Sequence, residues 1–158
     1  MDRNEIKNML RKSYLSQRNV YLTVEEKNGR HSHYAGKVSS SGDSEIVSLH
    51  SATPKGQDIL VYHGFRDGVV SAYLSPRYKD PIHKGCVIDT HYESIPLKKI
   101  LGKKRTVCYK TVFGNIGFID GTIAGVHCNP KNPSVEIATD GRILCMRKVK
   151  TGNIFSIS

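Results

Sequence analysis

The strongest constraint on the fold is the run of short apolar segments, separated by turn-forming residues, that fills the chain after residue 18. Val20, Leu22 and Val24 alternate with Tyr, Thr and Glu, and Asn28-Gly29 then supplies a hairpin turn. Similar segments follow at 45–50, 59–65, 69–74 and 86–90. No long helical pattern interrupts them. Because a period of two is typical of half-buried strands, we expect a mainly β protein.

The first 18 residues instead follow a helical pattern. Asp2 and Glu5 have the spacing of a capping box, and Ile6 and Leu10 fall on one face of the predicted helix. Four basic residues lie elsewhere on it: Arg3, Lys7, Arg11 and Lys12. Two interpretations of these four stay open, a solvated polar face or a secondary contact with nucleic acid.

A second β region follows a basic junction at 102–105, where both charge and composition change. A short helical turn at 94–101 precedes the junction, and strands are predicted at 106–112, 116–119, 122–126 and 135–149. Asp140-Gly141 is predicted to form a tight turn that pairs Ile137 with Leu144 and Val135 with Met146. We therefore expect a helix at 1–18 and two packed β units that form small closed barrels or sandwiches, the first at 19–101 and the second at 102–158.

Charge is distributed very unevenly along the chain. The net charge of +10 comes from 24 Lys and Arg against 14 Asp and Glu. Residues 1–18 carry five basic and two acidic residues, and residues 19–97 carry eight and nine. Residues 98–158 carry eleven basic residues and only three acidic ones. A field of this sign attracts polyanions, so the last third of the chain is the predicted binding region.

The candidate binding residues are therefore basic. Lysine and arginine neutralise phosphates and release condensed counterions, which gives affinity without reading the base sequence. The predicted set is Lys98, Lys99, Lys103, Lys104, Arg105, Lys110, Arg142, Arg147, Lys148 and Lys150. In a regular strand Arg147 and Lys148 point to opposite faces, so the set does not form a single contact surface. Nearby aromatic residues, Tyr109, Phe113 and Phe118, either stack on unpaired bases or fill the core, and we favour the core.

Catalytic and metal-binding patterns are weak. Asp89, His91 and Glu93 would share one face of a regular strand and form an acid–base cluster, but a polar outer face is the simpler interpretation. His31 and His33 would also project to one side of a strand, yet they have no evident third ligand, and we expect a solvated hairpin there. We predict no enzymatic activity, no metal and no cofactor. A small phosphodiester-cleaving enzyme that uses the Asp89 cluster is the least favoured alternative.

The setting expected from the sequence is the cytoplasm. The start of the chain has no apolar signal region. The chain also has no run of about 18 apolar residues, which is the length that a membrane-spanning helix needs. The cysteines, Cys86, Cys108, Cys128 and Cys145, are expected to be free thiols that pack as small hydrophobic residues.

One stretch resembles a known class of module. Residues 113–126, with Gly121-Thr122-Ile123, followed by residues 135–149, look like a small SH3-like barrel of the KOW or Tudor kind. This resemblance implies a mainly β fold of two packed small SH3-like β-barrels, with residues 20–101 as the more diverged one. The overall plan, a basic chain of this length, is also similar to the MotB family of early DNA-binding proteins of T-even phages. Either resemblance implies binding of nucleic acid with low sequence specificity and an effect on transcription or nucleoid structure. The expected partner is double-stranded DNA, with RNA or a host protein as the alternative.

Overall fold

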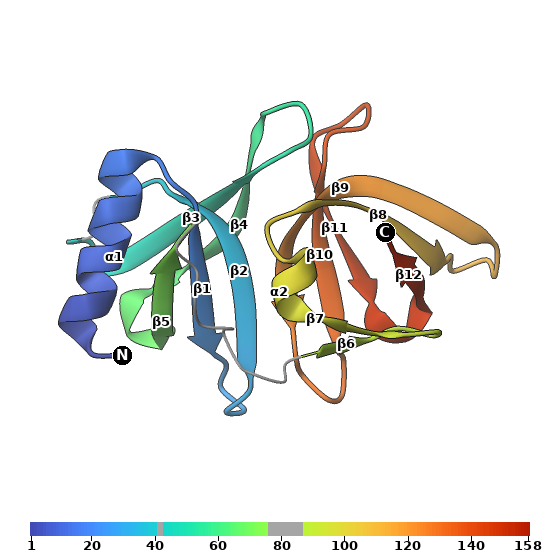
Figure 1. Ribbon diagram of the computed structural model, residues 1–158, viewed down its shortest axis with the longest axis horizontal. Helices are drawn as coiled ribbons and strands as arrows, with labels where there is room; N and C mark the ends of the chain where they lie inside the picture. The colour runs from blue at the N-terminus through green and yellow to red at the C-terminus, as the bar shows by residue number, and fades with distance from the viewer. Residues whose placement is uncertain (41–42, 76–86) are drawn as a thin grey trace.

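The computed structural model describes residues 1–40, 43–75 and 87–158. It is mainly β with one N-terminal helix, as predicted (Figure 1). Its elements are, in chain order, α1 (Arg3–Ser16), β1 (Val20–Glu25), β2 (His31–Val38), β3 (Ile46–Ala52), β4 (Asp58–Phe65), the 3-10 turn η1 (Arg66–Gly68), β5 (Val69–Leu74), β6 (Val87–Asp89), β7 (Ser94–Pro96), α2 (Leu97–Ile100), β8 (Lys104–Lys110), β9 (Ile116–His127), β10 (Ser134–Thr139), β11 (Cys145–Lys150), the 3-10 turn η2 (Thr151–Asn153) and β12 (Ile154–Ile157).

Helix α1 begins at the predicted capping box. The backbone N–H of Glu5 donates to the Asp2 carboxylate at 2.8 Å, and the Asp2 N–H donates to the Glu5 carboxylate at 3.0 Å. Both bonds satisfy donors that the first helical turn would otherwise leave unpaired. Ile6 and Leu10 are buried against the strands, so α1 covers one end of the sheet formed by β1, β2 and β5.

Two five-stranded units follow one another and have the same strand order. In the first unit, β1–β5, the pairings give the order β5-β1-β2-β3-β4. In the second unit, β8–β12, they give the order β12-β8-β9-β10-β11. A 3-10 turn precedes the last strand of each unit. Within the described residues neither β4 and β5 nor β11 and β12 pair, so both sheets are open.

The two units are an internal structural duplication. Several equivalent positions lie 85 residues apart, such as Arg66 and Thr151 at the start of each 3-10 turn. The same interval separates Gly36 from Gly121. A Cβ on Gly36 would lie 2.1 Å from a backbone oxygen of the next strand, and a Cβ on Gly121 would lie 2.5 Å from one. Only glycine permits so close an approach of two strands, and the requirement recurs at the same place in both copies.

A shared sheet joins the two units. Strands β2 and β9 pair antiparallel over Ser32–Tyr34 and Gly125–His127, which gives the continuous order β11-β10-β9-β2-β1-β5. Two apolar cores lie side by side. The core of the second unit also contains Ile88, Ile95 and Ile100, from β6, β7 and α2. The predicted boundary at residue 102 therefore falls within a stretch that packs into one core.

A polar network lies beside the joined strands. The Nδ1 atom of His127 lies 2.8 Å from the Ser32 hydroxyl and 3.4 Å from Glu26, and its Nε2 atom lies 2.8 Å from Glu136. The ring of Tyr34 packs edge-on against the imidazole, with ring centroids 5.5 Å apart. Burial, with the charge of Glu136 as a second cause, holds the pKa of Tyr34 well above its ordinary value.

Several local predictions were wrong. The β10–β11 hairpin pairs Ile137 with Arg147 and Val135 with Val149, because a loop at 140–144 replaces the two-residue turn. The two strands predicted at 116–119 and 122–126 form one strand, β9. The helical turn predicted at 94–101 is shorter, since residues 94–96 form β7. His33 is buried, with its Nδ1 atom 3.2 Å from the Thr23 hydroxyl, and does not lie on a solvated hairpin.

Candidate nucleic-acid interface

The first group of basic residues lies where α2 meets β8. Lys98 and Lys99 are exposed on α2, and Lys103 is exposed just after it. The Arg105 guanidinium donates to the backbone oxygens of Lys99 and Lys104 at 3.1 and 2.9 Å. The bond to Lys99 joins the end of α2 to the start of β8. The basic residues at this junction are here called the α2–β8 corner (Lys98, Lys99, Lys103 and Arg105).

The second group lies on the outer face of the β8–β9 hairpin. Val107 is fully buried in the core, so Lys104 and Lys110, three residues to either side, point outward. Lys104 pairs across the sheet with Thr122, and Lys110 pairs with Ile116. Opposed residues in an antiparallel pair share a face, so this outer face also carries Phe118 and Asp120. Lys104 lies beside the α2–β8 corner, and the two groups are contiguous along the chain.

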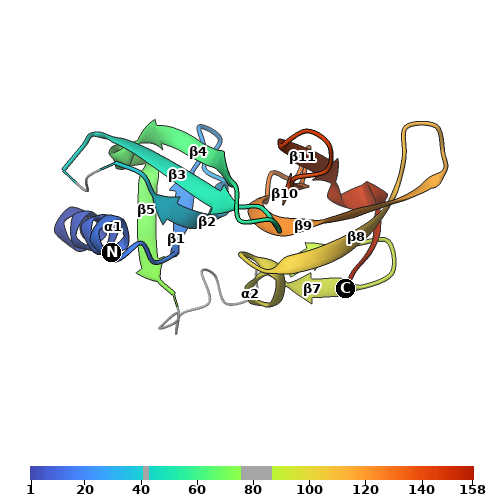
Figure 2. The ribbon, with the colours of Figure 1, turned by 90° about the horizontal axis from the view of Figure 1, so that it is seen from above.

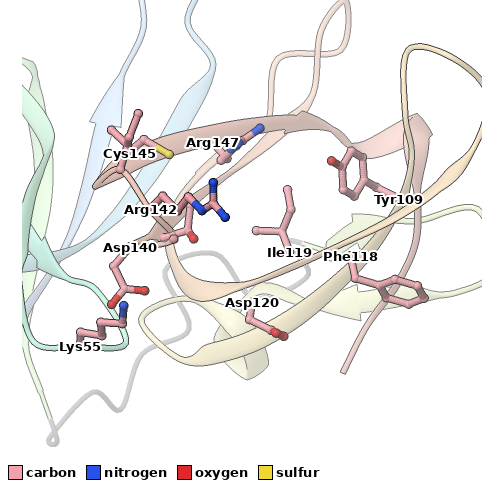
Figure 3. A pocket seen from close by; sticks show the side chains of 12 residues that line it. Lys55, Tyr109, Phe118, Ile119, Asp120, Asp140, Arg142, Cys145 and Arg147 are labelled. Atoms are coloured by element: carbon pink, nitrogen blue, oxygen red, sulfur yellow. The ribbon is translucent and has the colours of Figure 1, made fainter.

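The third group lines a groove of about 770 Å³ beside β9. Figure 3 shows Arg142 and Arg147 on the side of the β10–β11 hairpin, with Phe118 and Asp120 on the side of β9. Lys55 reaches the same groove from the β3–β4 turn of the first unit. Sequence analysis did not select Lys55, because it lies far along the chain from the basic region. Its only local signal is an exposed position in the Pro54-Lys55-Gly56 turn.

The remaining basic residues lie elsewhere. Lys148 and Lys150 are on the face of β11 opposite Arg147, as expected from strand alternation, and the Lys148 ammonium lies 3.9 Å from Glu136. The N-terminal residues Arg3, Lys7, Arg11 and Lys12 are on α1, at the opposite end of the molecule from the β8–β9 hairpin (Figure 2). Arg3 and Lys7 pair there with carboxylates, at 3.7 and 2.8 Å.

Two aromatic residues were misassigned to the core. Phe113 is 88% exposed and Phe118 is 69% exposed, whereas Tyr109 packs partly buried against the core of the second unit. Phe113 sits in the hairpin tip between β8 and β9 rather than in a strand. Phe118 lies on a strand, but on its outer face.

The predicted acid–base cluster does not form on a strand face. Asp89 ends β6, while His91 and Glu93 lie in the turn that leads to β7. The Asp89 carboxylate accepts from the Ser94 hydroxyl at 2.6 Å, and the His91 ring packs against Tyr92 and Phe155. Extended geometry over 89–93 was the wrong assumption, because a turn places these side chains in different directions.

Comparisons with family models, with curated proteins and with solved structures found no match. Among residues 1–40, 43–75 and 87–158, no group of three or more His, Cys, Asp or Glu side chains is placed to hold a metal ion. Within the same part of the chain no helix is long and apolar enough to cross a membrane. Cys108 and Cys145 are free thiols, and Cys128 packs partly buried against the core of the second unit. The prediction for Cys86 lies outside the described residues.

Proposed function

We propose that this protein binds double-stranded DNA through its phosphate backbone, with low sequence specificity, using the α2–β8 corner and the outer face of the β8–β9 hairpin. The observation that carries the proposal is the lack of carboxylate partners. Of the ten basic residues predicted to bind, only Lys148 makes an ion pair within the described part of the chain. Unpaired cations are free to neutralise phosphates, and this releases counterions.

The dimensions of the hairpin suit a duplex. Lys104 and Lys110 lie six residues apart on the same face, which is roughly 20 Å in an extended strand. That length matches the rise of about six base pairs at roughly 3.4 Å each. The α2–β8 corner extends the row of cations at the Lys104 end. A ligand with regularly spaced phosphates can therefore contact both groups at once.

The strand order supports an SH3-like interpretation of both units. Five strands in the order 5-1-2-3-4, with a 3-10 turn before the last, is the arrangement that we expect for a small barrel of the KOW or Tudor kind. We propose that both units are diverged copies of such a module, and that the protein acts in the cytoplasm, at the nucleoid, on transcription or nucleoid structure. A non-enzymatic role is part of this proposal.

The deciding experiment is a fluorescence-anisotropy titration with a labelled duplex across a range of salt concentrations. If four to six phosphates are neutralised, the slope of log K against log salt is about −4 to −5. The variant Lys104→Gln/Lys110→Gln should lose about 1.8 units of that slope and bind roughly 50-fold more weakly at about 0.1 M salt. Lys27→Gln/Arg30→Gln removes the same charge from the exposed β1–β2 turn and should bind like the wild type.

Two outcomes would overturn the proposal. One is affinity that does not depend on salt. The other is equal weakening by the two double variants, which would show that only net charge matters. Competition with single-stranded RNA and with heparin identifies the preferred polyanion, and a preference for RNA over duplex DNA would contradict the proposal as stated.

A further inference from the structure

The tip of the β8–β9 hairpin presents two adjacent apolar side chains to solvent. Val112 is 95% exposed and Phe113 is 88% exposed. The hairpin projects from the second unit, at the end of the molecule away from α1 (Figures 1 and 2). Large apolar side chains exposed side by side on a projecting element mark a contact surface, because water otherwise disfavours them.

The tip is an ordered turn. The Thr111 N–H donates to the Asn115 oxygen at 2.8 Å, and the Gly114 N–H donates to the Thr111 oxygen at 3.0 Å. A further bond joins the Asn115 N–H to the Thr111 hydroxyl at 3.2 Å. Gly114 has a φ of 84°, which completes the turn with a residue that accepts the left-handed conformation. The backbone thus fixes the two apolar residues at the apex.

The duplicated first unit shows that this turn has no need of apolar residues. Its β1–β2 tip, 85 positions earlier from Gly114 to Gly29, has the same two backbone bonds, Glu26 N–H to Arg30 oxygen at 2.7 Å and Gly29 N–H to Glu26 oxygen at 2.9 Å. The apex positions there are Lys27 and Asn28. The same fold element is therefore built with polar residues in one copy and with Val112 and Phe113 in the other. The turn itself therefore does not require the apolar pair.

The ligand of this hairpin must be anionic along its length and apolar at one point. Lys104 and Lys110 line the outer face below the tip, and Phe118 adds apolar surface beside them. Duplex DNA has this combination, since its phosphates flank a groove whose floor is the edge of the base stack. Proteins insert apolar side chains into the base stack from the minor groove. Apolar wedges inserted between base steps unstack and bend the duplex.

We propose that Val112 and Phe113 insert between neighbouring base pairs and bend the DNA that the cations of the second unit hold. This inference rests on the DNA binding proposed above. Insertion makes affinity depend on how easily a base step opens, so a duplex with a central mismatch should bind at least fivefold more tightly than the matched duplex.

The test is energy transfer between dyes at the two ends of a short duplex. The wild type should bend the duplex by an angle between about 20° and 90°. Val112→Gln/Phe113→Asn keeps the net charge and places at the apex of the turn the asparagine that already occupies it in the first unit, so the turn should fold. It should abolish the bend and the mismatch preference while leaving the salt slope unchanged. Leu15→Gln/Phe65→Gln removes two apolar side chains, on α1 and β4, each 69% exposed, and should change neither.

The outcomes separate the two proposals. Failure of the wild type to bind any duplex removes the proposed function. Binding without a bend, or a bend that survives Val112→Gln/Phe113→Asn, removes the insertion and leaves backbone binding in place. Tighter binding to single strands than to duplex, lost in the same variant, also overturns insertion, because it makes the tip a platform for unpaired bases. Lys104→Gln/Lys110→Gln should weaken matched and mismatched duplexes equally.

Discussion

Replacing His127 by alanine tests whether the polar network beside β2 and β9 holds the two units together. The imidazole makes contacts at 2.8 Å to Ser32 and to Glu136, and both ring and carboxylate are largely buried, with the side chains 12% and 16% exposed. A hydrogen bond to a charged group contributes roughly 1.5–3 kcal/mol, and a neutral one about 1. Partial exposure reduces the first value through solvent screening. We therefore expect His127→Ala to lower the free energy of unfolding by about 3 kcal/mol.

The chain provides a matched control. The Nδ1 atom of His63 also lies 2.8 Å from a serine hydroxyl, that of Ser48, but on an exposed face of β4. An exposed pair gains little over hydration, so His63→Ala should cost less than about 0.5 kcal/mol.

Urea denaturation followed by far-ultraviolet circular dichroism measures both variants. The wild type should unfold in one transition, because β2–β9 pairing and adjoining cores couple the two units. If His127→Ala and His63→Ala shift the midpoint equally, the network contributes nothing beyond a surface contact and the reasoning is refuted.

Three further predictions follow from single positions. Gly36→Ala should lower the free energy of unfolding, measured by urea denaturation, by roughly 2–3 kcal/mol, because the new Cβ would meet a backbone oxygen at 2.1 Å. Gly141→Ala has open space around the new Cβ and should leave the stability unchanged. Equal effects of the two variants would argue against the close approach of the strands at Gly36. Because the folded-state pKa of Tyr34 is raised above its ordinary 10.0, the unfolded chain loses this proton first, and stability should fall as pH rises above about 10. Phenolate absorbance should then rise for Tyr34 only with unfolding, and an alkaline stability profile identical in Tyr34→Phe would contradict this. Asp120→Asn should tighten duplex binding about fivefold in the anisotropy assay, because a carboxylate on the outer face repels phosphates; unchanged affinity would place the DNA elsewhere.

The elements that sequence analysis located correctly are those with local signals. The capping box at Asp2 and Glu5 placed the start of α1, and alternating apolar residues followed by the Asn28-Gly29 turn placed β1. The register predicted for the β10–β11 hairpin was wrong, and the reason is also local. A tight two-residue turn needs positive φ, and Gly141 does not adopt it, whereas Gly29, Gly56 and Gly114 do. The identity of the dipeptide alone does not reveal this difference.

Sequence analysis predicted the basic region of the candidate site but not how its side chains are arranged. Charge counting selected the basic last third of the chain, but it gave no directions to the side chains. Lys55 joins Arg142 and Arg147 only through the packing of the two units. Phe113 was missed as an exposed residue because it lies at the apex of the β8–β9 hairpin. The predicted strand at 106–112 ends later than β8 does, so the sequence did not locate this apex. Contacts between segments that are distant in the sequence determine where such side chains lie.

The antiparallel pairing of β2 with β9 has a consequence for how the chain avoids self-association. Each strand uses for its neighbour an edge that would otherwise offer unsatisfied N–H and C=O groups to a second molecule. Either half expressed alone, for example residues 1–75 or 87–158, would uncover three residues of that edge next to an exposed apolar core. Such fragments should be recovered as aggregates, whereas co-expression of both should restore a soluble, complemented pair.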